Sequence, residues 1–304
     1  MHVGTFLSSA GEQSWGLIEA DRVLPGPPLL TAAGLPSAPT LRAFLAGGGT
    51  GEQLNQARRH TSHAGFPLNA IRLLAPLPDP SKIVCMGLNF EDYRQILGLE
   101  YLAVPQLFLK APSAIVGPDQ PVEIPDGYGT VFHEFEIAAV IGRRLRQPRP
   151  DEIGRAIFGY TILNDLVLHD IELMTREYQQ WAKNCDTFAP MGPWITTAES
   201  MPIRDARMVR RRNGNVEAQS SSASMRHSFP DLIAFVASFM TLEPGDLVTS
   251  ASPPAGPFQS GDVIEVEVEG IGVLRNRVVG RDVDMRYADR LGLGMSPRLT
   301  EHSG

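Results

Sequence analysis

The stretch VFHEFEIAAVIG, at residues 131–142, decides how the surrounding chain folds. Its second half is an apolar, partly β-branched run that ends at Gly142, which predicts a buried strand. Glu134 and Glu136 stand two positions apart, so on a strand both carboxylates project from one face. Two like charges at the mouth of a buried strand are costly unless a cation shares them. The stretch therefore predicts either a divalent-metal site or a solvated strand end.

The composition is that of an ordinary globular protein. The 304 residues are 43% hydrophobic and 20% charged, with a net charge of -7, and suffice for one large domain and a smaller one. This charge argues against nucleic-acid binding, and the short basic run at residues 210–212 is interpreted as a solvated strand end before a turn. Two cysteines are too few for a disulfide framework or a Cys-based zinc site. We see neither a signal peptide nor a membrane-length apolar run, so we expect a cytoplasmic protein with no membrane partner.

The order of predicted elements divides the chain into a small N-terminal α/β domain, residues 1–76, and a larger β-rich part, residues 77–304. Prolines at 76, 78 and 80 mark the boundary. In the larger part we expect strands at 82–86, 106–109 and 159–163 and a final hairpin of 263–269 and 273–279. Helices are expected at 91–97, 151–156, 170–178 and 230–239, with an irregular segment at 181–190.

Several segments, taken in order, resemble the fumarylacetoacetate hydrolase superfamily. HEFE at residues 133–136 falls on the family's Glu-x-Glu metal motif, and residues 159–165 fall on the segment that supplies a third carboxylate. The other matching runs are KIVCMGLNF at 82–90, FLKAPSA at 108–114, KNCDTFAPMGP at 183–193 and FMTLEPGD at 239–246. The resemblance covers residues 70–280, and the N-terminal unit adds little to it.

The resemblance implies an α+β, β-rich fold with a mixed rolled β-sheet, commonly assembled as a homodimer. It places Glu134, Glu136 and Asp165 as ligands of a divalent ion. Carboxylates without a nearby His or Cys set suit Mg²⁺, or Mn²⁺ or Ca²⁺, rather than zinc. The implied partner is a small-molecule substrate, a 2-oxo or 1,3-dicarbonyl acid. The metal would act on it as a Lewis acid and stabilise an enolate.

Other matched positions suggest residues that handle the substrate. Lys183 is the next catalytic candidate, because a cation there would stabilise a developing oxyanion or carry a proton. Lys110, Ser113 and Ser252 are candidates for substrate binding. For Lys110 and Ser113 a structural role fits equally well.

The chain departs from the family pattern where a water is usually activated. Hydrolytic and decarboxylating members carry a His and a Glu on the short helix after the Gly-Leu-Asn turn, and Tyr93 and Ile96 occupy these positions here. Tyrosine has an unperturbed pKa of about 10 and is a poor base at neutral pH. His169 stands where relatives commonly have Arg, so His169 and Tyr93 are the candidates for replacing the missing pair.

Three functional hypotheses follow. The first is a metal-dependent hydrolase or decarboxylase that cleaves a C–C bond of a 2-oxo acid. The second is a tautomerase or isomerase, which keeps the enolate chemistry but needs no activated water. The third is a metal-binding homologue without turnover, which the retained carboxylates and Lys183 argue against.

Overall fold

The computed structural model describes residues 1–281 except 62–63, 99, 101–102, 175–178 and 202. Its largest sheet has 12 strands and joins the N-terminal strands to the rest of the chain. In sheet order these are β4 (Phe66–Pro67), β3 (Arg22–Pro25), β2 (Gln13–Glu19), β1 (His2–Leu7), β14 (Ala189–Thr197), β12 (Ile157–Leu163), β11 (Glu136–Ile141), β17 (Leu247–Thr249), β6 (Ile83–Gly87) and β7 (Gln106–Lys110). Two short strands join it at the side, β5 (Arg72–Leu73) on β1 and β8 (Ile115–Val116) on β14.

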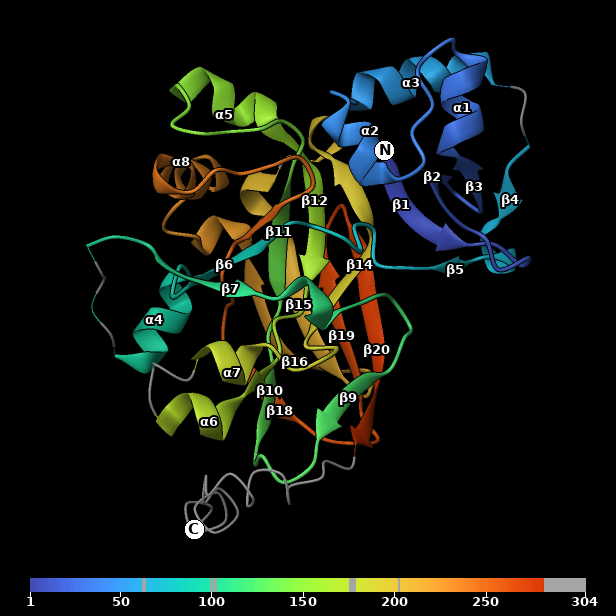
Figure 1. The fold of residues 1–304 in the computed structure, drawn as a ribbon. Helices are drawn as coiled ribbons and strands as arrows, with labels where there is room; N and C mark the ends of the chain where they lie inside the picture. Colours follow the sequence, from blue (N-terminus) through green and yellow to red (C-terminus); the bar gives the residue numbers. More distant parts are fainter. Residues whose placement is uncertain (62–63, 99, 101–102, 175–178, 202, 282–304) are drawn as a thin grey trace, which may run out of the picture.

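Two smaller sheets complete the rolled architecture (Figure 1). One has three strands in the order β13 (Val167–Leu168), β10 (Val131–His133) and β18 (Gly256–Phe258). The other has five, in the order β16 (Asn215–Ser221), β15 (Arg207–Arg212), β19 (Val263–Val268), β20 (Gly272–Arg281) and β9 (Val122–Pro125). The prediction of a β-rich α+β fold with a mixed rolled sheet is confirmed.

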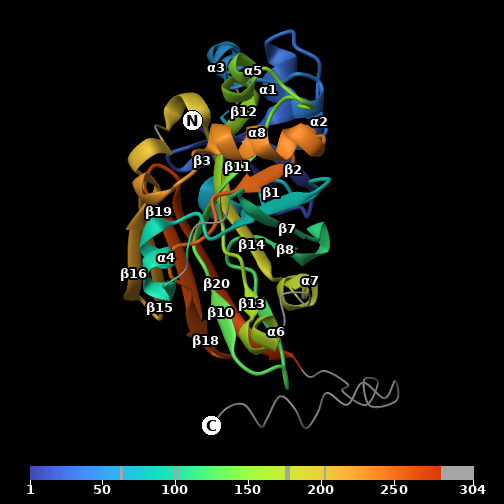
Figure 2. The same cartoon turned by 90° about the vertical axis from the view of Figure 1, so that its left-hand side faces the viewer.

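The helices are short and lie around the sheets. They are α1 (Gly26–Ala32), α2 (Leu41–Ala46), α3 (Gly51–His60), α4 (Glu91–Leu97), α5 (Pro150–Ala156), α6 (His169–Met174), α7 (Gln179–Lys183) and α8 (Phe229–Phe239). α1 contacts β2 and α3, and α5 contacts α8. α6 and α7 lie side by side next to β13 in both views (Figures 1 and 2). Each helix in the described part of the chain is too short or too polar to cross a bilayer.

Strand β11 is buried on both faces. It pairs antiparallel with β12 on one side and β17 on the other. Ile137, Ala139 and Ile141 pack into one hydrophobic cluster, whereas Ala138 and Val140 pack into another. Side chains of a strand alternate between its faces, so a strand that separates two apolar clusters must be apolar throughout. The predicted buried strand is therefore confirmed.

The strand predicted from the sequence is interrupted at Glu134 and Phe135, which separate β10 from β11. The break in the strand falls where the sequence predicted two carboxylates on one continuous strand. At this point side-chain oxygens, instead of the carbonyl groups of a neighbouring strand, accept the hydrogen bonds of the backbone N–H groups. The Glu134 N–H donates to Asn164 Oδ1 at 3.1 Å, and the Phe135 N–H donates to Ser252 Oγ at 3.2 Å. Buried backbone groups must be hydrogen-bonded, so these acceptors allow the chain to change sheets at this point.

Some of the remaining elements predicted from the sequence are confirmed, and others are corrected. The final hairpin and the helices at 91–97, 151–156 and 230–239 are confirmed within a residue or two. The irregular segment expected at 181–190 is confirmed at residues 184–188 and wrong at its two ends, because α7 runs to Lys183 and β14 starts at Ala189. The Asn184 side chain donates to Gln180 O at 2.6 Å and so completes the end of α7 through a contact that periodicity does not reveal. The end of the helix predicted at 170–178 lies outside the described residues.

The small N-terminal domain stays a prediction. Its first strand β1 pairs with β14, through His2↔Thr196 and Val3↔Ile195, and so belongs to the large sheet.

Asp246 fastens the parallel pair of β17 and β6 at its start. Its fully buried carboxylate accepts hydrogen bonds from the Ser81 N–H at 3.1 Å, the Ser81 hydroxyl at 2.5 Å and the Glu243 N–H at 2.7 Å. The Lys82 ammonium forms an ion pair with it. One side chain therefore joins two segments that are distant in the sequence.

We expect Asp246→Ala to lower the free energy of unfolding by about 3 kcal/mol, because it leaves several buried donors without an acceptor. Glu243→Ala is the matched control in the same turn. Its side chain pairs with exposed Arg144, and its loss should change stability by about 0.5 kcal/mol or less. Urea unfolding measures both variants, and equal effects would contradict the role given to Asp246.

Candidate active site

Three carboxylates converge where the sheets meet. Glu134 lies at the break, Glu136 begins β11, and Asp165 lies in the loop between β12 and β13. One oxygen atom from each lies within 4.8 Å of the others. Glu136 and Asp165 are fully buried, and the Glu134 side chain is 14% exposed. The structure thus brings together the three residues that the sequence predicted as a metal site.

Strand register explains this convergence. Glu136 stands opposite Leu163 in the antiparallel pair of β11 and β12. Asp165 follows two residues later, beside Asn164, whose side chain holds the Glu134 N–H. Strand pairing therefore brings Asp165 close to Glu134 and Glu136, although it is distant from them in the sequence.

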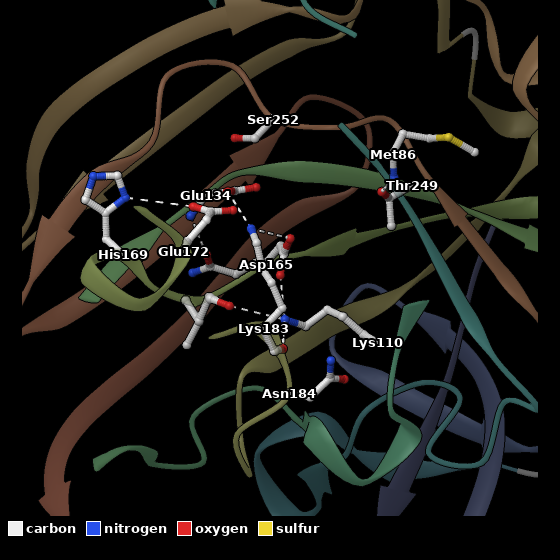
Figure 3. A network of polar contacts seen from close by, with 12 residues as sticks. Met86, Lys110, Glu134, Asp165, His169, Glu172, Lys183, Asn184, Thr249 and Ser252 are labelled. Atoms are coloured by element: carbon white, nitrogen blue, oxygen red, sulfur yellow. Dashed lines mark hydrogen bonds and ion pairs between the residues drawn. The ribbon is translucent and has the colours of Figure 1, made fainter. Parts of the chain in front are cut away.

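Two buried lysines contact the cluster (Figure 3). Lys183 Nζ lies 2.8 Å from Glu134 Oε1 and 2.8 Å from Asp165 Oδ2. Lys110 Nζ donates to Asp165 Oδ1 at 2.5 Å, to Leu166 O at 3.2 Å and to Lys183 O. An ammonium group has three hydrogens, and Lys110 uses all three within the protein. The arrangement therefore favours a role for Lys110 in holding Asp165 over the predicted contact to substrate.

Glu136 carries the unbalanced charge. Neither of its buried oxygens accepts a hydrogen bond from the described residues. Burial raises the pKa of Glu136 well above its usual value, and the negative charges of Asp165 and Glu134 raise it further, while the Thr249 side chain and the Lys183 charge lower it by less. A buried carboxylate without donors requires a cation or a proton. The oxygen-only donor set fits a divalent ion such as Mg²⁺, Mn²⁺ or Ca²⁺.

Tyr93 on α4, another predicted catalytic residue, is not suited to act as a base. Tyr93 is half-buried, and burial together with the charges of Glu134 and Glu172 raises the pKa of its hydroxyl. The hydroxyl therefore keeps its proton at neutral pH. Ile96 is 69% exposed, so the position for which the resemblance implies a Glu faces solvent in this chain.

The predicted serine contacts to substrate remain predictions. The Ser252 hydroxyl donates to Pro253 O at 2.6 Å and accepts from the Phe135 N–H, so it supports the chain between the two glutamates. Ser113 is exposed in the 3-10 turn Pro112–Ala114.

Sequence reasoning was wrong about Arg210, which is 5% exposed rather than solvated. Its guanidinium donates to His133 O at 3.2 Å and Pro254 O at 2.9 Å, and lies 5.9 Å from the centre of the Phe135 ring. Strand register explains its burial, because Arg210 stands opposite buried Val266 and shares its inward face, and the sequence alone does not give this register.

Sequence reasoning also missed Glu172, which lies three residues after His169 on α6. Glu172 Oε2 is 3.8 Å from His169 Nδ1, and its carboxylate acts on the pKa values of Glu134 and Lys183. The spacing of three residues was the available signal, because such pairs share one face of a helix.

The strand-rich rolled fold and the buried carboxylate cluster define an α+β protein with an acidic site at the junction of its sheets. The chain belongs to the fumarylacetoacetate hydrolase family, since the fumarylacetoacetate (FAA) hydrolase C-terminal family model matches residues 82–279.

Several relatives are enzymes with different reactions. A mitochondrial oxaloacetate tautomerase of Rattus norvegicus is 33% identical over 254 residues, 79% of this chain and 80% of the relative. A 5-carboxymethyl-2-hydroxymuconate delta-isomerase structure from Mycobacterium smegmatis matches with a TM-score of 0.74 and 29% identity, covering 92% of this chain and 99% of its own. A maleylpyruvate hydrolase from a Sphingobium species, in complex with manganese(II) and pyruvate, matches with a TM-score of 0.77 and 26% identity over 92% and 99%.

We expect Glu136→Gln to weaken Mn²⁺ binding by at least about 100-fold, because it removes a charged ligand. The same change should leave the metal-free protein as stable or more stable, since the raised pKa of Glu136 already favours an uncharged side chain there. Glu267→Gln on β19 is the control, because Glu267 pairs with Arg207 and Arg211 instead. Calorimetric titration with Mn²⁺ tests this, and unchanged affinity in Glu136→Gln would remove it from the ligand set.

The stability of the metal-free protein should depend on pH. Burial raises the pKa of Glu134 to about 7 against the opposing effect of Lys183, and Asp165 adds to the rise. A carboxyl group with a raised folded-state pKa stabilises the protein below its unfolded pKa of about 4. That contribution is lost as the pH rises through the folded pKa of about 7.

Mn²⁺ should therefore stabilise the protein more at a pH of about 8 than at about 5.5, because its ligands must be deprotonated. Thermal melts with and without Mn²⁺ at both pH values measure this. Equal metal-dependent shifts would contradict it.

Proposed function

We propose that this protein is a divalent-metal-dependent enzyme that acts on a 2-oxo or 1,3-dicarbonyl acid through an enolate of the substrate. The observation that carries the proposal is the convergence of Glu134, Glu136 and Asp165 with one charge left unbalanced. A divalent ion bound there would supply Lewis-acid stabilisation of negative charge on the substrate oxygens. Relatives that act on oxaloacetate, or that were solved with manganese and pyruvate, support this substrate class.

Lys183 contributes a fixed positive charge. Burial alone would lower the pKa of its ammonium group, but Asp165, Glu134 and Glu172 outweigh burial and raise the pKa well above its usual value. The group stays protonated, so its role is to donate a hydrogen bond to an oxygen on which charge develops. It does not act as a base.

Tautomerisation is the reaction that the geometry favours. It moves a proton between carbon and oxygen of the substrate and needs no activated water. In this chain Tyr93 keeps its proton and Ile96 faces solvent, so the helix that usually activates a water lacks the groups to do so. The similarity to an oxaloacetate tautomerase supports the same choice.

C–C bond cleavage, by hydrolysis or decarboxylation, is the second candidate. It is supported by the likeness to a maleylpyruvate hydrolase over 92% of this chain. A homodimer and a cytoplasmic location are kept as predictions from the sequence.

The two candidates predict different products from the Mn²⁺-loaded protein. We expect enol oxaloacetate to convert to the keto form faster than with Mn²⁺ alone, while an acylpyruvate releases no pyruvate. Lys183→Met should lower the tautomerisation rate by about 100-fold or more, because a donor to the developing oxyanion is lost, and should retain Mn²⁺ binding. Ultraviolet absorbance follows the enol, and chromatography detects pyruvate. Pyruvate release without tautomerisation would support cleavage instead, and no reaction with either compound would reject the proposal.

A further inference from the structure

We propose that Glu172 is the base that takes and returns the proton at this site, and that His169 is the positioning residue that holds it and passes the proton to solvent. The inference rests on the proposed function, because it names the groups that carry out tautomerisation. It also locates them on α6, away from the helix that bears the water-activating pair in hydrolytic relatives.

His169 is held in place from three sides. Its backbone N–H donates to Thr130 O at 2.8 Å, and its ring stacks on Phe132 with centroids 3.9 Å apart and planes 10° apart. Its Nδ1 lies 3.8 Å from Glu172 Oε2, at ion-pair distance. Phe132 stands two residues before Glu134, so the imidazole is fixed relative to the strand that leads into the carboxylate cluster.

Glu172 faces the cluster. Its carboxylate lies on the side of His169 that is directed toward Glu134 and Lys183 (Figure 3). It influences the pKa values of Lys183, Glu134 and Tyr93, residues that come from three different segments around the site. These effects agree with the orientation of the Glu172 side chain in Figure 3.

The pair also reaches water. The Glu172 and His169 side chains are 30% and 29% exposed, whereas those of Glu136 and Asp165 are fully buried. A proton accepted at Glu172 therefore has a short path through His169 to solvent. Asp170, the neighbouring acid on α6, instead accepts from the Thr130 N–H at 3.1 Å.

The protonation states of the residues in the site also favour Glu172 as the base. Lys183 and Tyr93 keep their protons, and Asp165 is engaged by two lysines. Burial raises the pKa of Glu172, but His169 and Lys183 outweigh it, so that the pKa lies below its usual value. Glu172 is therefore a charged carboxylate at neutral pH, ready to accept a proton.

The step balances without a further reactant. Glu172 takes a proton from C3 of a 2-oxo acid, and the C–H electron pair forms the C2=C3 bond. The C2=O electron pair moves onto oxygen, where Lys183 donates a hydrogen bond. Return of the proton to oxygen gives the enol, and its passage to His169 exchanges the C3 hydrogen with solvent. The reverse sequence converts the enol to the keto acid.

The first test is Glu172→Gln in the Mn²⁺-loaded full chain with oxaloacetate. We expect kcat to fall by about 10²–10⁴-fold, because general acid–base catalysis contributes that much. KM and Mn²⁺ affinity should change by no more than about threefold, since the carboxylate is not a ligand. Asp170→Asn is the matched control on the same helix, because its side-chain oxygen still accepts from the Thr130 N–H, and it should retain full activity.

The second test examines the role of His169, first through the pKa of Glu172 in the metal-free protein and then through deuterium exchange in the loaded enzyme. In the metal-free protein, His169→Gln should raise the pKa of the Glu172 carboxyl, followed by ¹³C NMR, because the interaction with the imidazole that lowers this pKa is removed. In the loaded enzyme the same variant should slow uptake of deuterium at C3 by about tenfold, and added imidazole should restore part of the rate.

The outcomes separate the two claims. If the wild type tautomerises oxaloacetate and Glu172→Gln does so equally fast, the pair is structural and this inference is wrong, while the proposed function stands. An unchanged Glu172 pKa in His169→Gln would remove His169 from the pair. If the wild type binds Mn²⁺ but acts on no 2-oxo acid, the proposed function fails, and the inference fails with it.

Discussion

Three carboxylates share one buried junction, and in the described part of the chain two lysine ammonium groups contact them. Among the residues that the structure describes, neither oxygen of Glu136 has a hydrogen-bond partner, which is costly for a buried carboxylate. A folded protein tolerates such a group when a ligand later compensates it, as happens when a metal ion binds. The requirement explains why buried lysines, a break between strands and side-chain acceptors all gather at this point.

The surrounding scaffold keeps this junction in place. Asn164 and Ser252 accept the N–H groups of Glu134 and Phe135, so that the chain can leave one sheet and enter another. Arg210 binds the carbonyl groups before and beside the break. Gly256 leaves room for it, because a Cβ there would lie 2.2 Å from the Arg210 Nη2 atom. The position of the glutamates therefore depends on residues from several distant segments.

The sequence predicted what local patterns can encode. The apolar run after Glu136 specified a buried strand, and the resemblance pointed to Asp165 as the third carboxylate. The break at Glu134 was not predicted, because its hydrogen bonds come from residues 30 and 117 positions away. Arg210 and Glu172 were missed for a related reason. Whether an arginine is buried depends on strand register, and whether a glutamate faces a site depends on how its helix packs.

Diffraction from crystals grown with Mn²⁺, measured at the manganese absorption edge, tests the central claim most directly. We expect one anomalous peak in contact with oxygen atoms of Glu134, Glu136 and Asp165, with the Lys183 ammonium displaced from Glu134. Direct coordination by carboxylate oxygens would place the metal at about 2.0–2.6 Å from each ligand atom. A peak elsewhere, with Lys183 still bridging Glu134 and Asp165, would contradict the account.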